Sequence, residues 1–546
     1  MREVSDENME IIGRGTWIDK VAWETIEQRK EFFGEKGEFR AESGLGASGF
    51  PHIGSLGDAV RGYGIKLASE DLGYKAKLIA FSDDMDGLRK IPSGLPDSLK
   101  VYLGFPVTSI PDPFKCHESY GEHMSSLLLD ALDRSGIEYE YASAKKLYEA
   151  GVFNSQIERI LSEWKKAGTI IKEETEQEKY IEVLPFHAVC SNCGRIYTTK
   201  TFEFLPREKK LAYVCEGMEI KGKMLEGCGN EDFADYTKGE GKLSWKVEFA
   251  ARWAALEIDF EAYGKDIADS VRVNDRISRE ILSYEPPYHI MYEMFLDKGG
   301  KKISKSAGNV FTPQVWFRYG ASQSLLLLLF KRFEGTRLIS VYDIPKYEDE
   351  FERLEEFYFI GKKLSNRAKE AKLRGLYEYC YLLNPPKNLK IHVPYKTLVN
   401  LIKVAPKDFK ENFLAEKLAE YDYIKRKNQI KELSEKIELC SNWVEDFETI
   451  AVKKEKREIE ISLKEMEALK DLIEVLEIES SGEKIQEAIF RIAKKHGIKP
   501  KTFFKLLYIV ILGESQGPKL GPYIVKIGPL KISKILLEKI NELEKT

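Results

Sequence analysis

Residues 38–55 read EFRAESGLGASGFPHIGS, and this stretch decides the fold. Its first four residues form a short extended segment, and the loop of small residues that follows leads into an amphipathic helix reaching about Ala68. Another helix is predicted before it at 20–35, and the segment KAKLIAF at 75–81 reads as a second strand. Strand, glycine loop, helix and strand in this order predict the opening unit of a doubly wound α/β domain of the Rossmann type.

The whole chain has 546 residues, too many for one compact core, and its composition is that of a globular protein. The 89 acidic residues nearly balance the 85 basic ones, so a nucleic acid would have to be met by local basic patches. The longest apolar run, Leu325–Phe330, is far shorter than the ~20 residues of a membrane helix. The acidic N-terminal residues contain no apolar signal segment. We therefore exclude membrane and secreted classes and expect a cytoplasmic protein.

The pattern along the chain predicts a Rossmann-type catalytic domain with an insertion, followed by an all-helical C-terminal half. We expect the first half of the catalytic domain at 1–100 and the insertion, which carries the cysteine and histidine clusters, at 101–240. The second half of the catalytic domain is expected at 241–320. Two helical regions are expected after it, at 321–385 and 386–546.

The loop between the first predicted strand and its helix contains Ser48, Gly49, His52, Gly54 and Ser55. Glycine lets the backbone approach a ligand closely, and the free N–H groups at a helix start attract phosphate. His52, one of only seven histidines, adds a donor for a phosphate or for a developing negative charge. The loop is therefore a candidate phosphate site, and a tight turn with a capping histidine is the alternative interpretation.

A second loop, about 250 residues later, contains Lys302, Ser304, Lys305 and Ser306. Two lysines and two hydroxyls on one loop can clamp a triphosphate and stabilise charge that moves onto pyrophosphate. Taken alone, a loop rich in lysine is more often a solvated surface.

The two loops together resemble the paired signature of class I aminoacyl-tRNA synthetases, here HIGS at 52–55 and KISKS at 302–306. Further stretches over nearly the whole chain are similar to the archaeal-type class I lysyl-tRNA synthetases. They are SGLGASGFPHIGS (43–55), FSDDMDGLRKIP (81–92), PDPF (111–114), ESYGEH (118–123), GKDIADS (264–270), KRFEGTRLISVYDIPKY (331–347) and GPKLGPYI (517–524). The related glutamate and arginine enzymes lack most of these stretches, which favours the lysine family.

The resemblance implies an ATP-dependent ligase that joins lysine to its tRNA in two steps. The lysine carboxylate attacks the α-phosphate of ATP, which arrives with Mg²⁺, and the 3′-terminal adenosine of tRNA(Lys) then takes the lysyl group from lysyl-adenylate. The expected catalytic residues are His52, Lys302 and Lys305. The expected ATP-binding residues are Ser48, Gly49, His52, Gly54, Ser55, Lys302, Ser304, Lys305 and Ser306. The expected partners are L-lysine, ATP and tRNA(Lys), and we expect a monomer.

A lysine pocket needs acids for the ammonium group. Glu42, Asp83, Asp84 and Asp86 lie at the carboxyl ends of the first two predicted strands, where α/β sheets bind ligands. The sequence therefore predicts these four acids as amino-acid ligands. A solvated loop with helix-capping acids is the alternative interpretation of the last three.

The methylene stem of lysine needs an apolar or aromatic wall, for which Trp245 and Tyr292 are the candidates. The resemblance places Gly44 and Gly46 in the amino-acid-binding loop and Trp245 on a pocket aromatic. The chain departs from the family at Ile267, where relatives commonly have histidine after Gly-Lys-Asp. One pocket or ATP contact of the family is therefore in question here.

Four of the seven cysteines cluster in the predicted insertion, at Cys190, Cys193, Cys215 and Cys228. Such clustering in a chain that is not secreted indicates a metal site more than disulfides. Four thiolates suit a closed, tetrahedral structural zinc site. The second pair is separated by twelve residues, which is unusual, so His187 is an alternative ligand. Buried free thiols are the alternative to a metal.

A second cluster combines Asp112, Cys116, His117 and His123. Their number and mix of donor atoms suit Zn²⁺, although the sequence does not determine their geometry. Polar residues that line a substrate channel are the alternative interpretation. Neither cluster needs to be catalytic, because adenylate formation requires no activated water.

Basic residues gather at three places in the helical half, which are 425–427, 453–457 and 494–501. Single-stranded bases are read by stacking and by hydrogen bonds to their edges, while basic side chains hold the backbone. Phe503, Phe504 and Tyr508 could stack on bases, but their helical spacing is more typical of a core. The resemblance implies that the last helical region binds the anticodon and that the region before it contacts the tRNA stem.

Three other functions compete with this interpretation. A class I synthetase for glutamate would need basic residues near Gly44 where this chain has acids, and an arginine enzyme is the related alternative. A nucleotidyltransferase that adenylates a small metabolite rarely carries a long helical region. A silent tRNA-binding paralogue would normally have lost His52 or the lysines of the second loop, and this chain has both.

Overall fold

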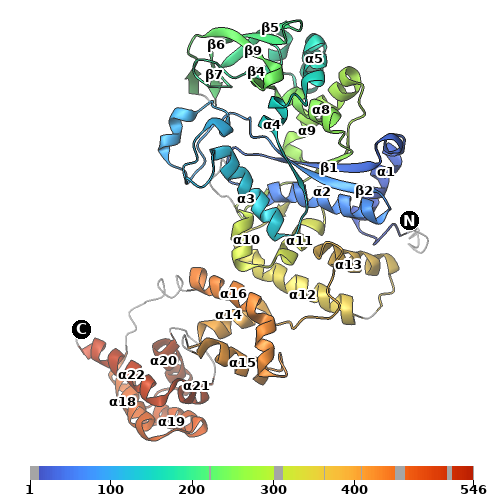
Figure 1. Ribbon diagram of the computed structural model, residues 1–546. Coiled ribbons are helices and arrows are strands. Elements are labelled where there is room, and N and C mark those ends of the chain that lie inside the picture. Colours follow the sequence, from blue (N-terminus) through green and yellow to red (C-terminus); the bar gives the residue numbers. More distant parts are fainter. Residues whose placement is uncertain are drawn as a thin grey trace, which may run out of the picture. The chain divides into compact units, whose positions relative to one another are not determined.

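The computed structural model describes residues 11–220, 223–300, 311–361, 363–406, 409–448, 461–512 and 519–544. The chain divides into two compact units, Met1–Leu389 and Lys390–Thr546 (Figure 1). The first unit is an α/β structure with an insertion, and the second is helical.

The strand–loop–helix–strand unit predicted from the sequence is present. Helix α1 (Trp17–Lys36) leads into strand β1 (Glu38–Leu45), and helix α2 (Ile53–Asp71) is followed by strand β2 (Lys75–Ser82). The two strands are parallel and in register from Glu38↔Lys75 to Leu45↔Ser82. Their carboxyl ends therefore lie side by side, as the Rossmann-type prediction requires.

These strands belong to a five-stranded parallel sheet with the order β12-β11-β1-β2-β3. The other members are β3 (Glu140–Ser143), β11 (Phe260–Gly264) and β12 (Tyr288–Tyr292). Strand β3 lies within 101–240, the range predicted as an insertion, yet it pairs with the end of β2. A strand of four residues at the edge of a sheet carries too short a periodic pattern to be recognised from sequence.

Helices cover both faces of the sheet (Figure 1). Leu78 faces α2, where a Cβ on Gly62 would lie 3.1 Å from its side chain. Ile79, the next residue, packs on the opposite face in a core with Phe249 and Trp253. These two aromatic residues belong to α8 (Trp245–Leu256), which packs beside α9 (Ala268–Ile277). Successive side chains of β2 therefore point to opposite faces of the sheet, one toward α2 and the next toward α8.

The segment between β3 and α8 forms the insertion. It begins with four helices, α4 (Ala144–Glu149), α5 (Asn154–Ser162), α6 (Trp164–Thr175) and α7 (Lys179–Glu182). Strands β4 (Phe186–Ala188), β5 (Thr199–Leu205), β6 (Lys210–Cys215), β7 (Gly217–Ile220), β8 (Lys223–Glu226), β9 (Glu231–Asp235) and β10 (Gly241–Leu243) follow. They make an antiparallel sheet β5-β6-β9, a hairpin β7–β8 and the pair β4–β10, which leads back to the main sheet (Figure 1). Helix α3 (Tyr120–Arg134) lies before β3.

After β12 the chain forms a short parallel pair and the helices that complete the first unit. The elements are β13 (Phe295–Leu296), α10 (Pro313–Tyr319), α11 (Ser322–Phe330), β14 (Arg337–Leu338), α12 (Ile344–Ile360) and α13 (Arg367–Cys380). The apolar run 325–330 lies in α11, where all six side chains are buried. Within the described residues, none of the helices has both the length and the apolar composition needed to span a bilayer.

The second unit is built from helices, and its described residues contain no strand. The helices are α14 (Tyr395–Lys403), α15 (Lys410–Glu420), α16 (Ser434–Trp443), α18 (Leu463–Ile478), α19 (Gly482–Lys495), α20 (Pro500–Leu512), α21 (Leu520–Ile527) and α22 (Pro529–Glu544). Phe503 is fully buried in the core of the last five helices, and Phe504 and Tyr508 pack against that core. The core interpretation of these aromatic residues is therefore the one the structure supports.

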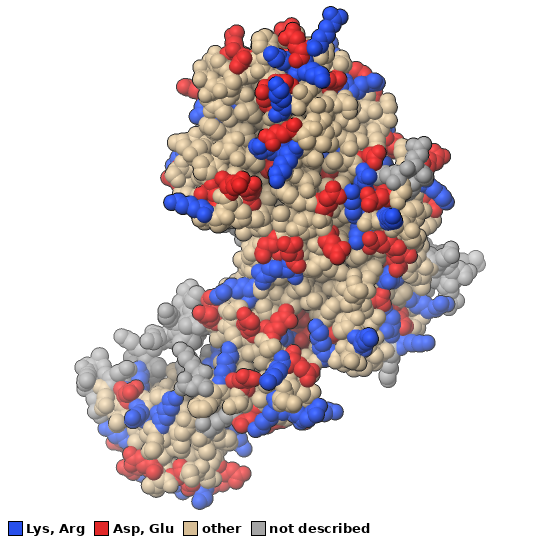
Figure 2. Space-filling view, viewed as in Figure 1, with Lys and Arg blue, Asp and Glu red and all other residues tan. Residues whose placement is uncertain are grey.

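Charged side chains of both signs are interspersed on the face seen in Figure 2. Of the predicted basic clusters, 425–427 is exposed, and the lysines at 494, 495, 499 and 501 are exposed as well. The cluster at 453–457 lies outside the described residues. Near the last cluster, His496 and Lys495 both contact Asp471 at 2.7 Å. The described residues on this face show no single large basic area.

Candidate active site

A pocket of about 480 Å³ opens at the carboxyl ends of β1, β2 and β11. This is the edge where open α/β sheets bind ligands. Residues predicted as site residues that line it are Gly44, Gly46, Ser48, His52, Gly54, Ser55, Asp83, Asp86, Trp245 and Tyr292. The structure thus brings together residues that lie up to 248 positions apart in the sequence.

One wall of the pocket is the N-terminus of α2. His52 is the N-cap of this helix, with extended backbone, and its Nδ1 accepts a hydrogen bond of 3.1 Å from the Ser55 N–H. An imidazole that accepts at Nδ1 carries its proton on Nε2. A Cβ on Gly54 would lie 2.8 Å from the ring, so glycine is required there. His52 caps the helix, as the alternative interpretation of this loop expected, and it also lines the pocket, so binding of a phosphate here stays a prediction. Gly49 is buried in the same loop.

The acids expected to bind an ammonium group have different surroundings. Glu42 is fully buried below the pocket, where one carboxylate oxygen lies 2.5 Å from Nε of Arg252 on α8. Burial raises the pKa of Glu42 despite the charge of Arg252. Asp83 lines the pocket, 3.5 Å from the same guanidinium. Burial raises its pKa to about 7, against the opposing charges of Arg252 and Lys242.

The structure does not bring Asp84 to the pocket. It accepts hydrogen bonds from the Ser143 hydroxyl (2.5 Å) and from the Lys145 N–H (2.8 Å) at the start of α4. Both of its oxygens are engaged with the β3–α4 connection. Asp84 therefore behaves as the helix-capping acid of the alternative interpretation, but it is buried and not solvated.

Asp86 lines the pocket and is held by Lys242 of β10 at 2.6 Å. The ammonium of Lys242 also lies 2.8 Å from Glu248 of α8, and Tyr148 donates a hydrogen bond to Glu248 at 2.8 Å. Three charged side chains from the main fold and the insertion thus form one buried group. Sequence reasoning missed Lys242, Glu248 and Arg252. Their signal was the presence of charged residues inside the otherwise apolar stretch 241–256.

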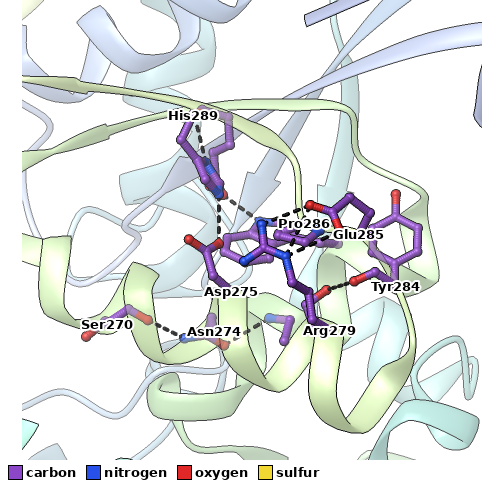
Figure 3. A network of polar contacts seen from close by, with 12 residues as sticks. Ser270, Asn274, Asp275, Arg279, Tyr284, Glu285, Pro286 and His289 are labelled. Carbon is purple, nitrogen blue, oxygen red and sulfur yellow. Dashed lines mark hydrogen bonds and ion pairs between the residues drawn. The ribbon is translucent and has the colours of Figure 1, made fainter. Parts of the chain in front are cut away.

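Buried hydrogen bonds hold the backbone at Trp245, at the start of α8. Asn274 of α9 is fully buried, and its amide nitrogen donates to the Trp245 carbonyl at 3.1 Å and to the Ser270 carbonyl at 2.8 Å. Its oxygen accepts from the Ala250 N–H at 2.9 Å. Figure 3 shows Asn274 beside the pair His289–Asp275, whose atoms are 3.1 Å apart. Asn274 of α9 therefore holds the backbone at the start of α8, which the sequence around Trp245 does not reveal.

The second predicted loop cannot be compared with the pocket. Lys302, Ser304, Lys305 and Ser306 lie at 301–310, outside the described residues. The chain enters this region from β13 and leaves it at Phe311, whose carbonyl accepts a hydrogen bond from the Ile53 N–H at 3.0 Å. That bond joins Phe311, the first described residue after the gap, to the first turn of α2.

The four cysteines come together. All ligand atoms of Cys190, Cys193, Cys215 and Cys228 lie within 4.8 Å of one another. Two of the sulfur separations are 3.6 and 3.8 Å. Tetrahedral thiolates on a zinc ion with bonds of about 2.3 Å are about 3.8 Å apart, so the arrangement fits this ion. Side-chain contact with Asn192 is the main factor that lowers the pKa of Cys228, to about 6. His187 lies elsewhere, in a cavity described below.

The second predicted cluster also comes together. The sulfur of Cys116 lies 3.2 Å from a ring nitrogen of His117 and 3.2 Å from one of His123. It lies 3.3 Å from a carboxylate oxygen of Asp112. Burial opposes ionisation of Asp112, but three backbone N–H groups outweigh it and lower the pKa of this acid to about 2. The group offers a charged oxygen, a thiol and two imidazoles, a donor set that Zn²⁺ accepts.

A second cavity of about 400 Å³ adjoins the pocket and shares Asp86, Arg89 and Trp245 with it. The other lining residues include the basic Lys179, Lys242 and Lys246 and the aromatic Tyr180 and Tyr197. Burial, with the nearby charges of Lys179, Lys242 and Arg89, lowers the pKa of His187 to about 3. In this cavity four basic side chains outnumber the acids Asp86 and Glu219, whereas five acids outnumber three basic side chains among the residues that line the first pocket.

Comparison with known proteins gives a consistent result. Residues 15–382 match a family model described as tRNA synthetases class I (K), and residues 401–534 match one described as anticodon binding domain. A lysine--tRNA ligase of Cenarchaeum symbiosum (strain A) is 48% identical over 524 residues, which cover 96% of this chain and 98% of that protein. A lysine--tRNA ligase of Rickettsia bellii (strain OSU 85-389) is 33% identical over 93% of this chain and 94% of that protein. A glutamate-tRNA synthetase structure from Elizabethkingia anophelis aligns with 92% of this chain and 100% of its own, at a TM-score of 0.42 and 11% identity.

Proposed function

The chain belongs to the lysine-specific family of class I tRNA synthetases, and on that premise we propose how its pocket joins L-lysine to tRNA(Lys). The observation that carries the proposal is the pocket itself. A helix N-terminus capped by His52 faces a cavity lined by the acids Asp83 and Asp86. One end suits phosphate and the other suits an ammonium group.

In the first step the lysine carboxylate attacks the α-phosphorus of ATP, and the bond to pyrophosphate breaks. The Gly54 N–H at the start of α2 and the Nε2–H of His52 hold and polarise the phosphates, while the N–H groups of Ile53 and Ser55 donate to Phe311 and to the His52 ring. By family resemblance, Lys302 and Lys305 stabilise the charge on the leaving pyrophosphate, and Ser304 and Ser306 shape their loop. Catalysis then rests on positioning and charge stabilisation, with no covalent protein nucleophile. Class I synthetases in general use ATP together with Mg²⁺.

Lysine binds at the acid-lined end. We assign the ammonium contact to Asp83 and Asp86, because Glu42 lies below the pocket and Asp84 is engaged elsewhere. Trp245 covers the methylene stem. Arg252 and Lys242 keep the acids in place, and the surplus of carboxylates among the lining residues favours a cation over glutamate.

In the second step the 2′-hydroxyl of the terminal adenosine of tRNA attacks the carbonyl carbon of lysyl-adenylate, and AMP leaves. The positive, ring-lined cavity that shares Trp245 with the pocket has the chemistry to hold the single-stranded end of tRNA. Cations would contact its phosphates and rings would stack on its bases. The matched anticodon binding domain supplies the distant contact.

We further propose that both clusters hold structural zinc. The cysteine cluster would tie the segment after β4 to the antiparallel sheet of the insertion through Cys190 and Cys215. The other cluster would order the loop before α3, where Tyr120 donates a hydrogen bond of 3.0 Å to the carbonyl of Ser48. Zinc in that cluster would supply four-coordinate rigidity and no reacting group. Its effect would reach the ATP-binding loop through Tyr120.

The decisive test is tRNA aminoacylation with each of the twenty radiolabelled amino acids and bulk tRNA, followed by purified tRNA(Lys). Charging of lysine alone is the expected result. Charging of glutamate or arginine would contradict the assignment of the pocket acids. Bound tRNA without any charging would indicate a silent tRNA-binding protein.

Zinc is tested separately, by metal analysis of the purified chain and of two variants, Cys193→Ser and His123→Ala. We expect two zinc ions per chain and the loss of one in each variant. A chain that folds and charges lysine without zinc would remove the metal from the proposal and leave the rest intact.

A further inference from the structure

The wall of the pocket formed by α2 contains a buried charge that the proposed reaction does not use. Arg61 is fully buried, and none of its three guanidinium nitrogens hydrogen-bonds to a residue that the structure describes. Removing a guanidinium from water without hydrogen bonds is strongly unfavourable. A residue that lowers stability in this way points to a role in function.

The surroundings of Arg61 are built to receive it. The centre of its guanidinium lies 4.2 Å from the centre of the Tyr292 ring. A Cβ on Gly57, one turn earlier on α2, would lie 2.7 Å from Nη1 of Arg61, too close for any other residue without a shift. The absence of a side chain at Gly57 thus provides the space for the guanidinium. A ring on one side and a glycine on the other fix its position.

Both neighbours of Arg61 connect it to the pocket. Tyr292 lines the pocket, and its hydroxyl donates a hydrogen bond to Asp58. Asp58 also lines the pocket and lies three residues before Arg61 on the helix. The guanidinium therefore lies behind a pair of residues that face the ligand. Arg61 acts on the pocket wall in two ways, through its contact with the Tyr292 ring and through the attraction between its charge and Asp58.

The charges around Asp58 compete. Burial raises the pKa of Asp58 to about 7, and the hydrogen bond from Tyr292 and the charge of Arg61 oppose this rise. The other charged groups that face it are Asp266 and Glu261, and both add to the rise. Arg61 is the cation in this set, so it favours the ionised form of a carboxylate near neutral pH.

We propose that Arg61 is a positioning residue that holds the Tyr292 ring and the Asp58 carboxylate in the pocket wall, so that Asp58 accepts a hydrogen bond from the bound nucleotide. The inference rests on the proposed function, which places the phosphates of ATP at His52. Asp58 lies six residues further along α2, about 9 Å along the helix axis. The donors that ATP offers at such a distance from its phosphates are the ribose hydroxyls and the adenine amino group.

The first test is Arg61→Met, which keeps most of the volume and removes the charge. We expect the KM for ATP in tRNA(Lys) charging to rise about tenfold or more, the cost of a weakened charge-assisted hydrogen bond. The KM for lysine should change less than about twofold, since the acids at the other end are untouched. The midpoint of thermal unfolding should stay the same or rise, because the variant removes a buried charge that lacks hydrogen bonds.

A second variant tests the geometry. Gly57→Ala pushes the guanidinium away from the Tyr292 ring, so it should raise the KM for ATP when Arg61 is present. In the Arg61→Met background the same substitution should have little further effect, because the side chain it displaces is gone. Additive effects of the two substitutions would contradict the proposed placement.

The pH dependence gives a readout that a purely structural role would not change. Asp58 accepts a hydrogen bond more strongly when it is ionised, so ATP use should improve as the pH rises through its pKa. Without Arg61 the pKa of Asp58 rises further, so the pH at which ATP use improves should be higher in Arg61→Met than in the wild type. An unchanged pH dependence would overturn the proposal.

The contacted donor is identified with ITP, which lacks the amino group, and with 2′-deoxy-ATP and 3′-deoxy-ATP. The analogue that lacks the contact should be used less well than ATP by the wild type, and this difference should shrink in Asp58→Asn. If the preference for ATP over each analogue is the same in the wild type and in Asp58→Asn, Asp58 makes no nucleotide contact.

The outcomes separate this inference from the proposed function. A wild-type chain that does not charge tRNA(Lys) would overturn both. A wild type that charges lysine beside an Arg61→Met variant with an unchanged KM for ATP would overturn this inference alone. A variant with a lower unfolding midpoint and equal changes in both KM values would show Arg61 to be merely structural.

Discussion

Two walls of the same pocket each contain a fully buried arginine, and the two arginines are held in opposite ways. Arg252 lies among carboxylates, at 2.5 Å from Glu42, 3.0 Å from Glu261 and 3.5 Å from Asp83. Arg61 has a tyrosine ring at 4.2 Å and no hydrogen bond among the described residues. The first arrangement compensates the charge of the arginine within the protein, and the second leaves it to act on the pocket through Tyr292 and Asp58. Burial alone therefore does not show whether a charge serves stability or function.

The surroundings explain the difference. Arg252 lies between β1, β2 and β11, and each of these strands places an acid within reach. Arg61 lies on the other side of the sheet, where α2 meets β12 and α11, and these elements offer a ring and leucines. The acids of the pocket divide in the same manner. Asp83 and Asp86 share cations from α8 and β10, whereas Asp58 is bonded by a hydroxyl.

The largest expected effect is that of Arg252→Met. It would leave Glu42, Asp83 and Glu261 buried without their cation, which should lower the free energy of unfolding by about 3–5 kcal/mol. Denaturant unfolding monitored by tryptophan fluorescence measures this. Arg61→Met is the matched control, with an expected loss close to zero. Equal losses in the two variants would remove the distinction between the walls.

Asp58→Asn should change how stability depends on pH. The pKa of Asp58 is raised by burial to about 7 in the folded protein, above its unfolded value, so the folded state binds the extra proton between about pH 4 and 7. This stabilisation is complete below the unfolded pKa and is lost as the pH rises through 7. Relative to wild type, Asp58→Asn should therefore gain up to about 4 kcal/mol between pH 4 and 8.

Urea unfolding of both proteins across this range measures the difference. A constant offset between the two curves would mean that Asp58 is ionised throughout, and Arg61 would then have no role in its charge.

Asp83→Asn should raise the KM for lysine by about 10- to 100-fold, the loss of one hydrogen bond between charged groups. The KM for ATP should stay within about twofold. Asp84→Asn is the matched control next in sequence, because Asp84 bonds Ser143 and Lys145 away from the pocket. If Asp84→Asn raised the KM for lysine as strongly, the division between the two acids would be incorrect. Steady-state charging of tRNA(Lys) gives both constants.

The smallest expected effect belongs to Tyr120→Phe. The variant removes the hydrogen bond of 3.0 Å to the Ser48 carbonyl and leaves the ring in its core. One neutral hydrogen bond contributes about 1 kcal/mol, so the KM for ATP should rise about two- to tenfold while that for lysine is unchanged. An effect on lysine instead would show that the Ser48 loop serves the other wall.

The sequence by itself determined the elements that depend on neighbouring residues. The loop 42–55 predicted the strand–loop–helix unit and the cap at His52, because turn and cap geometry are set by glycine and by side chains a few positions away. The two groups of potential ligands, Cys190–Cys193–Cys215–Cys228 and Asp112–Cys116–His117–His123, were also predictable as groupings, since their members are few and close in sequence. The family followed from the same local motifs.

Only the tertiary structure decided which charges are available. Four acids were predicted at the strand ends. Glu42, however, forms an ion pair with Arg252, which lies 210 residues away in the sequence, and Asp84 accepts a hydrogen bond from Ser143. The pairing of β3, the acids that Lys242 contacts and the lack of a hydrogen-bond partner for Arg61 among the described residues likewise could not be predicted from the sequence. The reason is physical: the effect of a charge depends on its distance from other charges and from water, and the fold, not the local sequence, determines both.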